Sequence, residues 1–371
     1  MGTGNGRNGG SFSQVQKLGI SNASTGVAFT RIGKFILKNT ERLLYVLAFF
    51  ISGIFSEAQN GPPKSSAGRL SVGLKVTEYA PGDDSARLRF PTHIAFGPGD
   101  CEVITDLKNN RFLFREGSKN PFKVSPVPVR GAHSIVYNPT DKLYYANDTE
   151  NHRIIAFADL SQKTIQAKTM RIAGIPLNRP HDVVLDSAAG WIYAINPKSG
   201  HVFRFTGIGK NESAIKVPLQ GYARALTFTD GKLYVIGSAK GRIVEIVDWD
   251  TPTFKIYDSY DSTGRQGSAG SWATTGLVLN DAEFYKGYWY ASSFFTKFHA
   301  KDSDYDENKF IRFKTLDDLN KGKWTDLSEM LPSGMTPYYL TVNQGKLYLA
   351  IFNHEVPGKG DSILQITPRL R

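Results

Sequence analysis

The sequence predicts an all-β protein whose residues 70–371 form a six-bladed β-propeller of four-stranded antiparallel blades. One strand-like opening occurs six times, and the third residues of successive copies are 41, 48, 43, 51 and 63 positions apart. Repeats of about 40–50 residues built from short strands are typical of propellers. The six openings are Thr92–Phe96, His133–Tyr137, His181–Leu185, Arg224–Phe228, Thr275–Leu279 and Tyr338–Val342.

Each opening is followed by two further strand-like segments. They are rich in Tyr, Val, Ile and Phe, and Gly, Asn, Asp and Pro separate them, which is typical of strands and turns. The predicted second strands are Glu102–Asp106, Leu143–Asp148, Trp191–Asn196, Leu233–Ser238, Tyr288–Ser293 and Leu347–Asn353. The predicted third strands are Arg111–Phe114, Arg153–Phe157, His201–Phe205, Arg242–Ile246, Phe310–Phe313 and Ser362–Ile366.

Outer fourth strands are weaker in the sequence, and the last unit has no room for one before Arg371. In contrast, Leu70–Tyr79 is strand-like and belongs to no unit. We therefore expect Leu70–Tyr79 to pair with Ser362–Ile366, which closes the ring and protects the edges of the first and last blades. The other fourth strands are predicted at Phe122–Val127, Thr164–Ile172, Ala214–Leu219 and Phe254–Tyr260.

The chain before the propeller divides into three predicted segments. Residues 1–29 are rich in Gly, Ser and Asn and indicate a disordered extension. Residues 30–58 combine basic residues, an apolar run at Leu43–Phe55 and small residues around Glu57, which is typical of a signal peptide. A membrane anchor is the alternative for this segment, and residues 59–69 are a linker. Both alternatives place the propeller outside the cytoplasm, as a secreted, periplasmic or membrane-anchored domain.

Composition narrows the classes of partner. The net charge is +11, and six basic and two acidic residues lie within 1–58, which leaves +7 for the rest. The remaining charges are scattered with no basic and aromatic stripe, so we expect no nucleic-acid partner and no membrane contact except through an N-terminal anchor. Cys101 is the single cysteine, so no intramolecular disulfide forms.

Two motifs resemble the NHL repeat, a family of propeller blades. Asp106-Leu-Lys-Asn109-Asn-Arg111-Phe and Asp148-Thr-Glu-Asn151-His-Arg153-Ile match its Asp-x-x-Asn-x-Arg core. The resemblance covers the first four units and implies a propeller. Physically, the Asp can accept hydrogen bonds from turn amides while the Arg bridges neighbouring turns, so we interpret these motifs as structural.

The start of each first strand holds the polar residues that we assign to ligand binding. In an antiparallel blade, the start of the first strand and the end of the second lie at one edge, so these positions surround one mouth of the central channel. All seven histidines fall at this face by the same reasoning. The predicted mouth residues are Thr92, His133, His181, Arg224, Thr275 and Tyr338, with Asp182 and Tyr339 one position further on.

The openings at His133 and His181 are similar to those of NHL-like peptidylglycine amidating lyases. Ala132-His133-Ser134 and Pro180-His181-Asp182 match two of the family's three zinc-binding openings. The first unit departs from the pattern, because Thr92 precedes His93 and the histidine is shifted by one position. The resemblance implies a divalent metal on His133 and His181, zinc before calcium, whereas imidazoles that only form loop hydrogen bonds are the alternative.

A calcium site at the channel mouth receives less support from the sequence. Gluconolactonase-like and paraoxonase-like propellers hold calcium through Glu, Asn and Asp, and this mouth offers only Asp182 and Asn280 of that set. The acidic segment Asp302–Asn308 lacks the glycine and the terminal glutamate of an EF-hand loop. No phosphate-binding loop, Gly-x-Ser-x-Gly or His-Glu-x-x-His motif occurs in the chain.

Two functional hypotheses follow. In the first, an exported propeller binds a peptide, a glycan or a small anionic molecule at the mouth lined by His133, His181 and Arg224. In the second, a metal-dependent lyase or hydrolase uses the same mouth. Its metal lies on the two histidines, and Arg224 stabilises an oxyanion. Tyr338 or Asp182 would then act as the general base.

Overall fold

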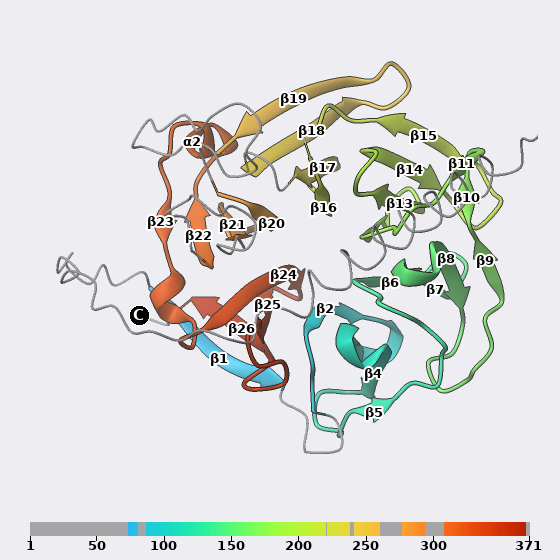
Figure 1. The fold of residues 1–371 in the computed structure, drawn as a ribbon, viewed down its shortest axis with the longest axis horizontal. Coiled ribbons are helices and arrows are strands. Elements are labelled where there is room, and N and C mark those ends of the chain that lie inside the picture. The colour runs from blue at the N-terminus through green and yellow to red at the C-terminus, as the bar shows by residue number, and fades with distance from the viewer. Residues whose placement is uncertain are drawn as a thin grey trace, which may run out of the picture. The chain divides into compact units, whose positions relative to one another are not determined.

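The computed structural model of the protein describes residues 73–80, 87–219, 221–237, 241–259, 277–293 and 308–368. These residues form a six-bladed propeller of four-stranded antiparallel sheets arranged around a central axis (Figure 1). This confirms the predicted fold class. The segments 1–29, 30–58 and 59–69 lie outside the described residues. Within the described part of the chain, no helix is long and apolar enough to cross a membrane.

The first strand of each blade lies nearest the axis, and the chain moves outward strand by strand (Figure 1). The first blade contains β2 (Pro91–Phe96), β3 (Cys101–Asp106), β4 (Arg111–Glu116) and β5 (Lys123–Val124). The second contains β6 (Ile135–Asn138), β7 (Leu143–Asp148), β8 (Arg153–Phe157) and β9 (Ala167–Thr169). The third contains β12 (Val183–Asp186), β13 (Trp191–Asn196), β14 (His201–Phe205) and β15 (Ser213–Lys216).

The remaining blades follow the same order. The fourth contains β16 (Ala223–Thr229), β17 (Lys232–Gly237), β18 (Arg242–Asp248) and β19 (Thr253–Asp258). The fifth contains β20 (Leu279–Tyr285), β21 (Tyr288–Ser293), β22 (Lys309–Phe313) and β23 (Thr325–Asp326). The sixth contains β24 (Met335–Asn343), β25 (Lys346–Asn353) and β26 (Ser362–Pro368). Outside the blades lie the hairpin of β10 (Arg171–Ile172) and β11 (Ile175–Pro176) and the helix α2 (Leu316–Asn320).

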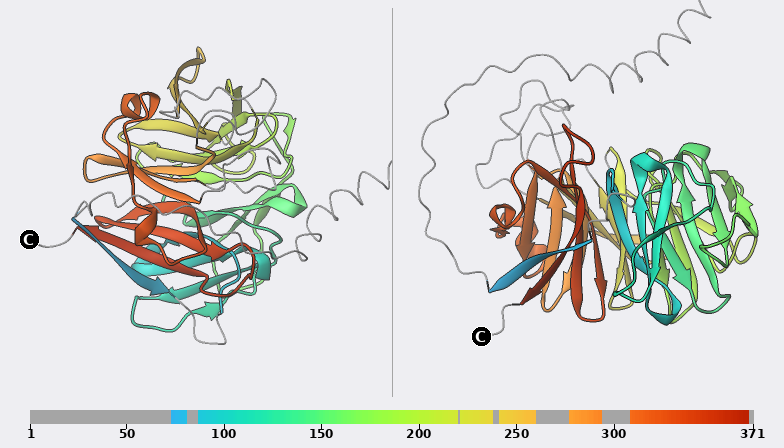
Figure 2. Two further views of the ribbon diagram at one scale, coloured as in Figure 1. Left: turned by 60° about the vertical axis from the view of Figure 1, so that its left-hand side comes forward. Right: turned by 90° about the horizontal axis from the view of Figure 1, so that it is seen from below.

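The ring closes through the strand β1 (Leu74–Ala80), which pairs antiparallel with β26 from Leu74↔Pro368 to Ala80↔Ile363. Figure 2 shows β1 in blue alongside the red strands of the sixth blade. The predicted pairing of the N-terminal strand with the last blade is therefore confirmed. The Tyr79 hydroxyl also donates to Glu102 Oε1 of the first blade at 2.6 Å, so β1 contacts both blades of the seam.

The opening predicted for the fifth blade is wrong in register. We predicted Leu277 as the buried third residue, whereas β20 begins at Leu279 and Ala282 pairs with Ala291 in the middle of β21. Thr275 lies outside the described residues, and its assigned position is held by Asn280. The apolar residues Gly-Leu-Val-Leu had predicted a strand at this point. In the structure, the strand of the ring includes the polar residues Asn280 and Asp281, which follow that segment.

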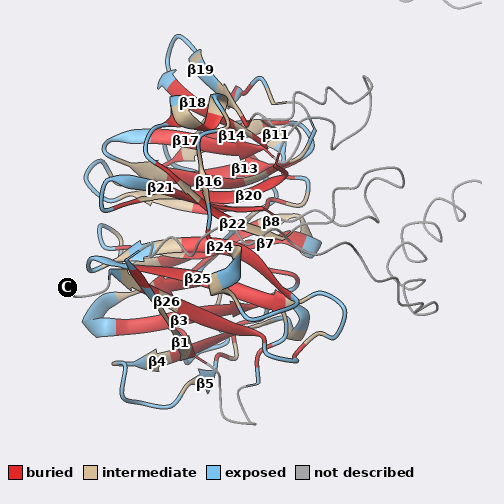
Figure 3. Ribbon diagram, turned by 90° about the vertical axis from the view of Figure 1, so that its left-hand side faces the viewer, coloured by how far each residue is buried: buried red, intermediate tan, exposed pale blue. Residues whose placement is uncertain are grey.

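The core is divided among the contacts between blades, and the buried stretches follow the strands from one blade to the next (Figure 3). Aromatic pairs contribute about 0.5–1.5 kcal/mol each beyond the area that they bury. Those that join neighbouring blades are Phe112–Phe157, Tyr145–Phe205, Tyr193–Phe228, Tyr234–Trp289 and Phe96–Tyr348.

The NHL-like motifs have the structural role that we predicted. Asp148 is fully buried, bonds to Arg153 Nε at 2.6 Å and accepts from the Arg130 amide at 2.7 Å. Asp106 does the same with Arg111 Nε at 2.8 Å and the Arg89 amide at 2.7 Å. Each carboxylate thereby fixes the loop that enters its own blade, which positions the start of the first strand at the channel mouth.

Candidate functional site at the channel mouth

The pairing of first and second strands defines which residues are equivalent at the mouth. Ile94, Ile135, Val183, Leu226, Ala282 and Leu340 each face the middle of the second strand. The residues two positions earlier lie toward the mouth, and in the first, fourth, fifth and sixth blades a β-bulge at this point interrupts the alternation of side chains. These mouth positions are Thr92, His133, His181, Arg224, Asn280 and Tyr338.

The structure brings His133 and His181 together. Their imidazole rings stack with centroids 3.8 Å apart and an angle of 21° between the planes. The two residues are only 9% and 3% exposed, so the pair is buried at the mouth rather than placed on its rim. Tyr338 and Tyr339 stack in the same way, with ring centroids 4.7 Å apart, and both lie about 6.2 Å from a histidine ring.

Hydrogen bonds assign the tautomer of His181. Its Nδ1 lies 2.9 Å from the Arg224 carbonyl oxygen and 2.7 Å from the Tyr339 hydroxyl oxygen. A carbonyl oxygen only accepts, so Nδ1 carries the proton and Nε2 keeps a lone pair. The Tyr339 hydroxyl donates to the same carbonyl at 2.6 Å. The Arg224 carbonyl at the start of the fourth blade therefore binds both His181 of the third blade and Tyr339 of the sixth blade.

His133 contacts the Tyr338 hydroxyl. Its Nδ1 lies 3.4 Å from that oxygen, and the same hydroxyl is also hydrogen-bonded by the Arg224 side chain. Tyr338 therefore lies between the His133 imidazole and the Arg224 guanidinium. In the stacked pair, the acceptor nitrogen is Nε2 of His181.

Both imidazoles are neutral at physiological pH. Burial, with the Arg224 and Arg179 charges adding to it, lowers the pKa of His133 to about 3. Burial and the neighbouring His133 lower the pKa of His181 well below its usual value. Burial also raises the pKa of Tyr338 to about 12, so its phenol stays protonated and is not a ready general base.

Two arginine side chains, Arg224 and Arg179, lie near the histidines. The Arg224 guanidinium lies 5.4 Å from the ring centre of Tyr222, and the edge of Tyr222 meets the face of His181 with centroids also 5.4 Å apart. Arg179 is nearby and forms a bidentate pair with Glu150 at 2.7 and 2.8 Å. Arg224 and Tyr222 are half-buried, so part of each side chain reaches solvent next to the buried His181.

Asp182 acts as a clamp between blades. Its Oδ1 accepts from the Val183 amide at 2.8 Å, and its Oδ2 accepts from the Leu226 amide of the fourth blade at 2.7 Å. Burial outweighs these bonds and raises the Asp182 pKa to about 7. With both oxygens engaged by backbone, Asp182 is positioned to hold two blades together rather than to take a proton from a substrate.

Asp281 repeats this clamp and was not anticipated from the sequence. Its oxygens accept from the Ala282 amide at 2.8 Å and from the Leu340 amide of the sixth blade at 2.7 Å. Burial and the nearby Asp182 raise its pKa well above the usual value, and burial with the Asp281 and Asp182 charges raises the pKa of Glu283. The signal available in the sequence was an Asn-Asp pair immediately before a strand, matching the His181-Asp182 pair.

The other mouth residues are structural or lie deeper. Thr92 is buried, and its hydroxyl donates to the His133 carbonyl oxygen at 2.8 Å. His93 lies in the channel with its ring 6.4 Å from that of Tyr339, and burial lowers its pKa to about 4. Arg179 and Tyr222 were not predicted, because they lie in connecting loops where strand periodicity carries no information.

The described residues do not fit a shared metal ion. Zinc lies about 2.0–2.1 Å from an imidazole nitrogen, along the lone pair and so in the ring plane. Two rings stacked within 21° have planes that do not meet near their nitrogens, so one ion cannot satisfy both. Among the described residues, no three His, Cys, Asp or Glu side chains gather to hold a metal. His299, Asp302, Asp304 and Asp306 lie outside those residues.

Comparisons with known proteins agree with the fold. No family model and no curated protein matches the chain. A solved structure of a putative gluconolactonase is 13% identical and has a TM-score of 0.55, covering 81% of this chain and 94% of its own. A catalytically inactive virginiamycin B lyase from Staphylococcus aureus, solved with quinupristin, is 12% identical with a TM-score of 0.53, covering 79% and 99%.

A third similar structure, from Bacteroides thetaiotaomicron, is a protein of unknown function. It is 13% identical to the chain with a TM-score of 0.53, and the match covers 79% of this chain and 76% of that one. At these identities the likeness concerns the propeller architecture alone. The class defined by the fold is therefore the six-bladed β-propeller, with lyase and lactonase propellers among the structures that share it.

Proposed function

We propose that the chain is an exported ligand-binding propeller that holds a small anionic molecule at the channel mouth. The observation that carries this proposal is the placement of the Arg224 guanidinium against the Tyr222 ring, which packs on His181 of the stacked histidine pair. Neutral imidazoles do not compete with the guanidinium groups for an anion. Guanidinium groups bind carboxylates and phosphates strongly because their N–H donors match the oxygens in geometry.

The tautomer of His181 refines the ligand class. His181 Nε2 accepts and the Arg224 guanidinium donates, so the mouth fits a ligand that both donates and accepts. A hydroxyl or amide next to an anionic group has this character, and a hydroxycarboxylate is its simplest form. Tyr222 supplies an apolar wall beside the guanidinium of Arg224.

Binding is proposed in preference to turnover because the groups assigned to base chemistry are poorly placed for it. Both Asp182 oxygens accept from backbone amides, and the Tyr338 phenol is protonated at physiological pH. The metal-dependent lyase or hydrolase remains the second hypothesis from the sequence. It predicts stoichiometric zinc in the purified protein, which elemental analysis measures directly.

Calorimetric titration of the full chain with L-lactate, acetate and the neutral lactamide tests the proposal. We expect saturable binding of lactate, weaker binding of acetate and none of lactamide. Arg224→Gln should weaken lactate binding at least tenfold, whereas Lys123→Gln removes the same charge from the exposed outer strand β5 and should leave it unchanged. His133→Ala with His181→Ala should abolish it. No anion binding, or lactate binding that survives Arg224→Gln, would contradict the proposal.

A further inference from the structure

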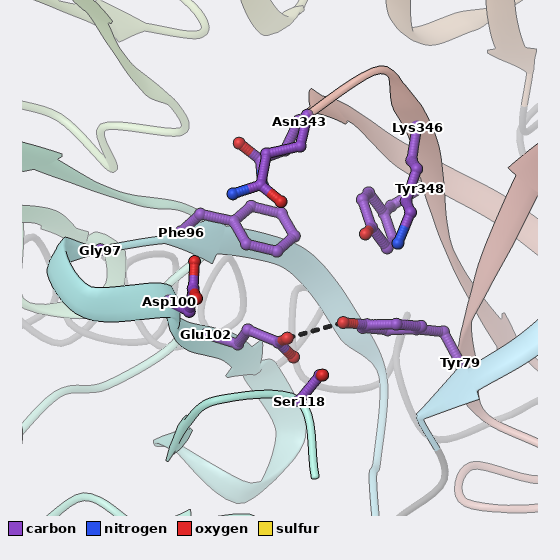
Figure 4. A pocket seen from close by; sticks show the side chains of 10 residues that line it. Tyr79, Phe96, Gly97, Asp100, Glu102, Ser118, Asn343, Lys346 and Tyr348 are labelled. Atoms are coloured by element: carbon purple, nitrogen blue, oxygen red, sulfur yellow. Dashed lines mark hydrogen bonds between the residues drawn. The ribbon is translucent and has the colours of Figure 1, made fainter.

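A cavity of about 280 Å³ lies at the seam between the sixth and first blades (Figure 4). Its walls include Tyr79 of β1, Phe96 at the end of β2 and Tyr348 of β25. Asp100 lines it from the turn that follows β2, and Asn343 lines it from the end of β24. The cavity is built by three segments that are far apart in the sequence.

This cavity is separate from the channel mouth. The mouth residues begin the first strands, whereas Phe96 ends β2 and Asn343 ends β24. Thr92 and Phe96 are four positions apart on one strand, which corresponds to about 13 Å at 3.3 Å per residue. The cavity therefore opens on the opposite face of the disc. A ligand bound there does not contact Arg224 or the two histidines.

Three aromatic rings form the apolar part of the cavity. Phe96 and Tyr348 have ring centroids 5.1 Å apart at 47°, and Tyr79 meets Tyr348 edge-on at 4.9 Å. Phe96 and Tyr79 are only half-buried, although they belong to a packed seam. Their ring surface therefore remains in contact with the cavity and can pack against the C–H groups of a ligand.

The charges around the rings are balanced. Glu102 is buried, and its carboxylate is paired with Arg115 at 2.7 Å and with the Tyr79 hydroxyl at 2.6 Å. The exposed Asp100 carboxylate and the exposed Lys346 ammonium carry opposite charges at the rim. Neither a strongly anionic nor a strongly cationic ligand gains from this arrangement.

The remaining polar groups are small and diverse. Ser118, Asn343 and Gln344 add a hydroxyl and two side-chain amides around the same opening, so the rim offers both hydrogen-bond donors and acceptors. A ligand that fits has an apolar face for the rings and several hydroxyls at its edge. These are the properties of a sugar ring.

We propose that the cavity at the seam binds one neutral pyranose unit of a saccharide. Small-molecule pockets measure about 300–1,000 Å³, so this cavity is at the lower limit and suits a single ring rather than an extended chain. Phe96 and Tyr79 contact the sugar, and the buried Tyr348 supports both rings from behind. Asp100, Asn343 and Gln344 hydrogen-bond its hydroxyls, and the rest of a longer glycan extends into solvent.

Ring closure and sugar binding are coupled at this site. Tyr79 reaches the cavity only when β1 is paired with β26, so the sugar binds the closed ring and not an opened one. A ligand that binds only one state stabilises that state by RT ln(1 + [L]/Kd). Bound sugar should therefore slow amide hydrogen exchange in β1.

Saturation-transfer NMR on the full chain, with the methyl glycosides of glucose, galactose, mannose and N-acetylglucosamine as probes, tests this site. We expect saturable binding of at least one glycoside. Phe96→Leu keeps an apolar side chain but removes the ring, and Asn343→Ala removes the amide, and each should weaken binding at least tenfold. Arg224→Gln should leave glycoside binding unchanged, which separates this site from the proposed anion site.

Hydrogen exchange of β1 with and without the bound glycoside provides the second measurement, and slower exchange is expected. Three results would overturn the proposal. They are no saturable binding of any of the four glycosides, binding that both variants retain, and binding of glucuronate without binding of the neutral glycosides.

Discussion

The imidazole of His133 lies face to face with that of His181, although the two residues belong to different blades. Their positions are equivalent in the second and third blades, so the repeat of the propeller brings the two side chains to neighbouring points at the channel mouth. The stack is compatible with neutral rings and not with two imidazolium ions, because like charges at this separation repel. The arrangement explains why the mouth combines buried histidines with an arginine that supplies the positive charge.

The first prediction concerns the titration of these histidines. NMR of the imidazole resonances should show His133 titrating near pH 3 and His93 near pH 4, so neither changes between pH 5 and 8. Arg224→Gln should raise the His133 pKa, because the arginine charge is its second cause after burial. A midpoint of His133 close to its usual value of 6.5 would show that the mouth is open to water.

The second prediction concerns the clamp residues Asp182 and Asp281. Asn at either position directs an amide nitrogen at a backbone N–H, so we expect a loss of about 1–3 kcal/mol in the free energy of unfolding. Asp230→Asn is the matched control, because Asp230 is exposed and has positive φ, which Asn tolerates. Urea unfolding measures all three variants, and a loss at position 230 as large as that at 182 would contradict the clamp.

The cost of Asp182→Asn should also depend on pH. The pKa of Asp182 is raised from 3.8 to about 7 in the folded protein, so between these values the native state holds a proton that the unfolded chain has released. The stabilisation from this proton is present in acid and is lost as pH rises through about 7. The variant should therefore cost more at pH 5 than at pH 8. An equal cost at both pH values would mean that Asp182 is ionised throughout.

The fold was largely predictable because apolar residues mark each repeat of the propeller in the sequence. Openings such as Thr92–Phe96 and Tyr338–Val342 alternate in a way that predicts a strand, and the unpaired Leu70–Tyr79 predicted the closure. The fifth blade failed for a physical reason. Asn280 and Asp281 are polar yet buried, and the carboxylate of Asp281 is compensated by the amide of Leu340, which is 59 residues away. The periodicity of apolar residues gives no information about such a distant hydrogen-bond partner.

The candidate site was predictable only in part. Counting two residues back from each buried strand residue predicted His133, His181, Arg224 and Tyr338 as mouth residues, and the structure brings the two histidines together. The stacking of the two histidines depends on the angle between neighbouring blades, which no residue pattern specifies. The cavity at the seam depends likewise on three distant segments meeting, and only the pairing of β1 with β26 brings Tyr79 to it.

The third prediction concerns the segment before the propeller. If 30–58 is a signal peptide, mass spectrometry of exported protein should find a mature chain that begins near Gln59. If the segment is a membrane anchor, the intact chain should instead fractionate with membranes and be released by detergent. An intact chain recovered from the cytoplasm without membranes would contradict export in either form.

The last prediction concerns the closing strand. Removing the chain up to Arg69 should leave the thermal midpoint unchanged, whereas removing it up to Ala80 should lower the midpoint strongly. The longer deletion exposes the edge of β26 and uncovers the core that Leu74 and Ala80 bury. Tyr79→Phe is the milder test, because it loses one hydrogen bond to Glu102 and should cost about 1 kcal/mol. Glu102 keeps its pair with Arg115 in that variant, so a much larger loss would mean that the hydroxyl does more than join the two blades. If deletion through Ala80 left the midpoint in place, β1 would not be the element that closes the ring.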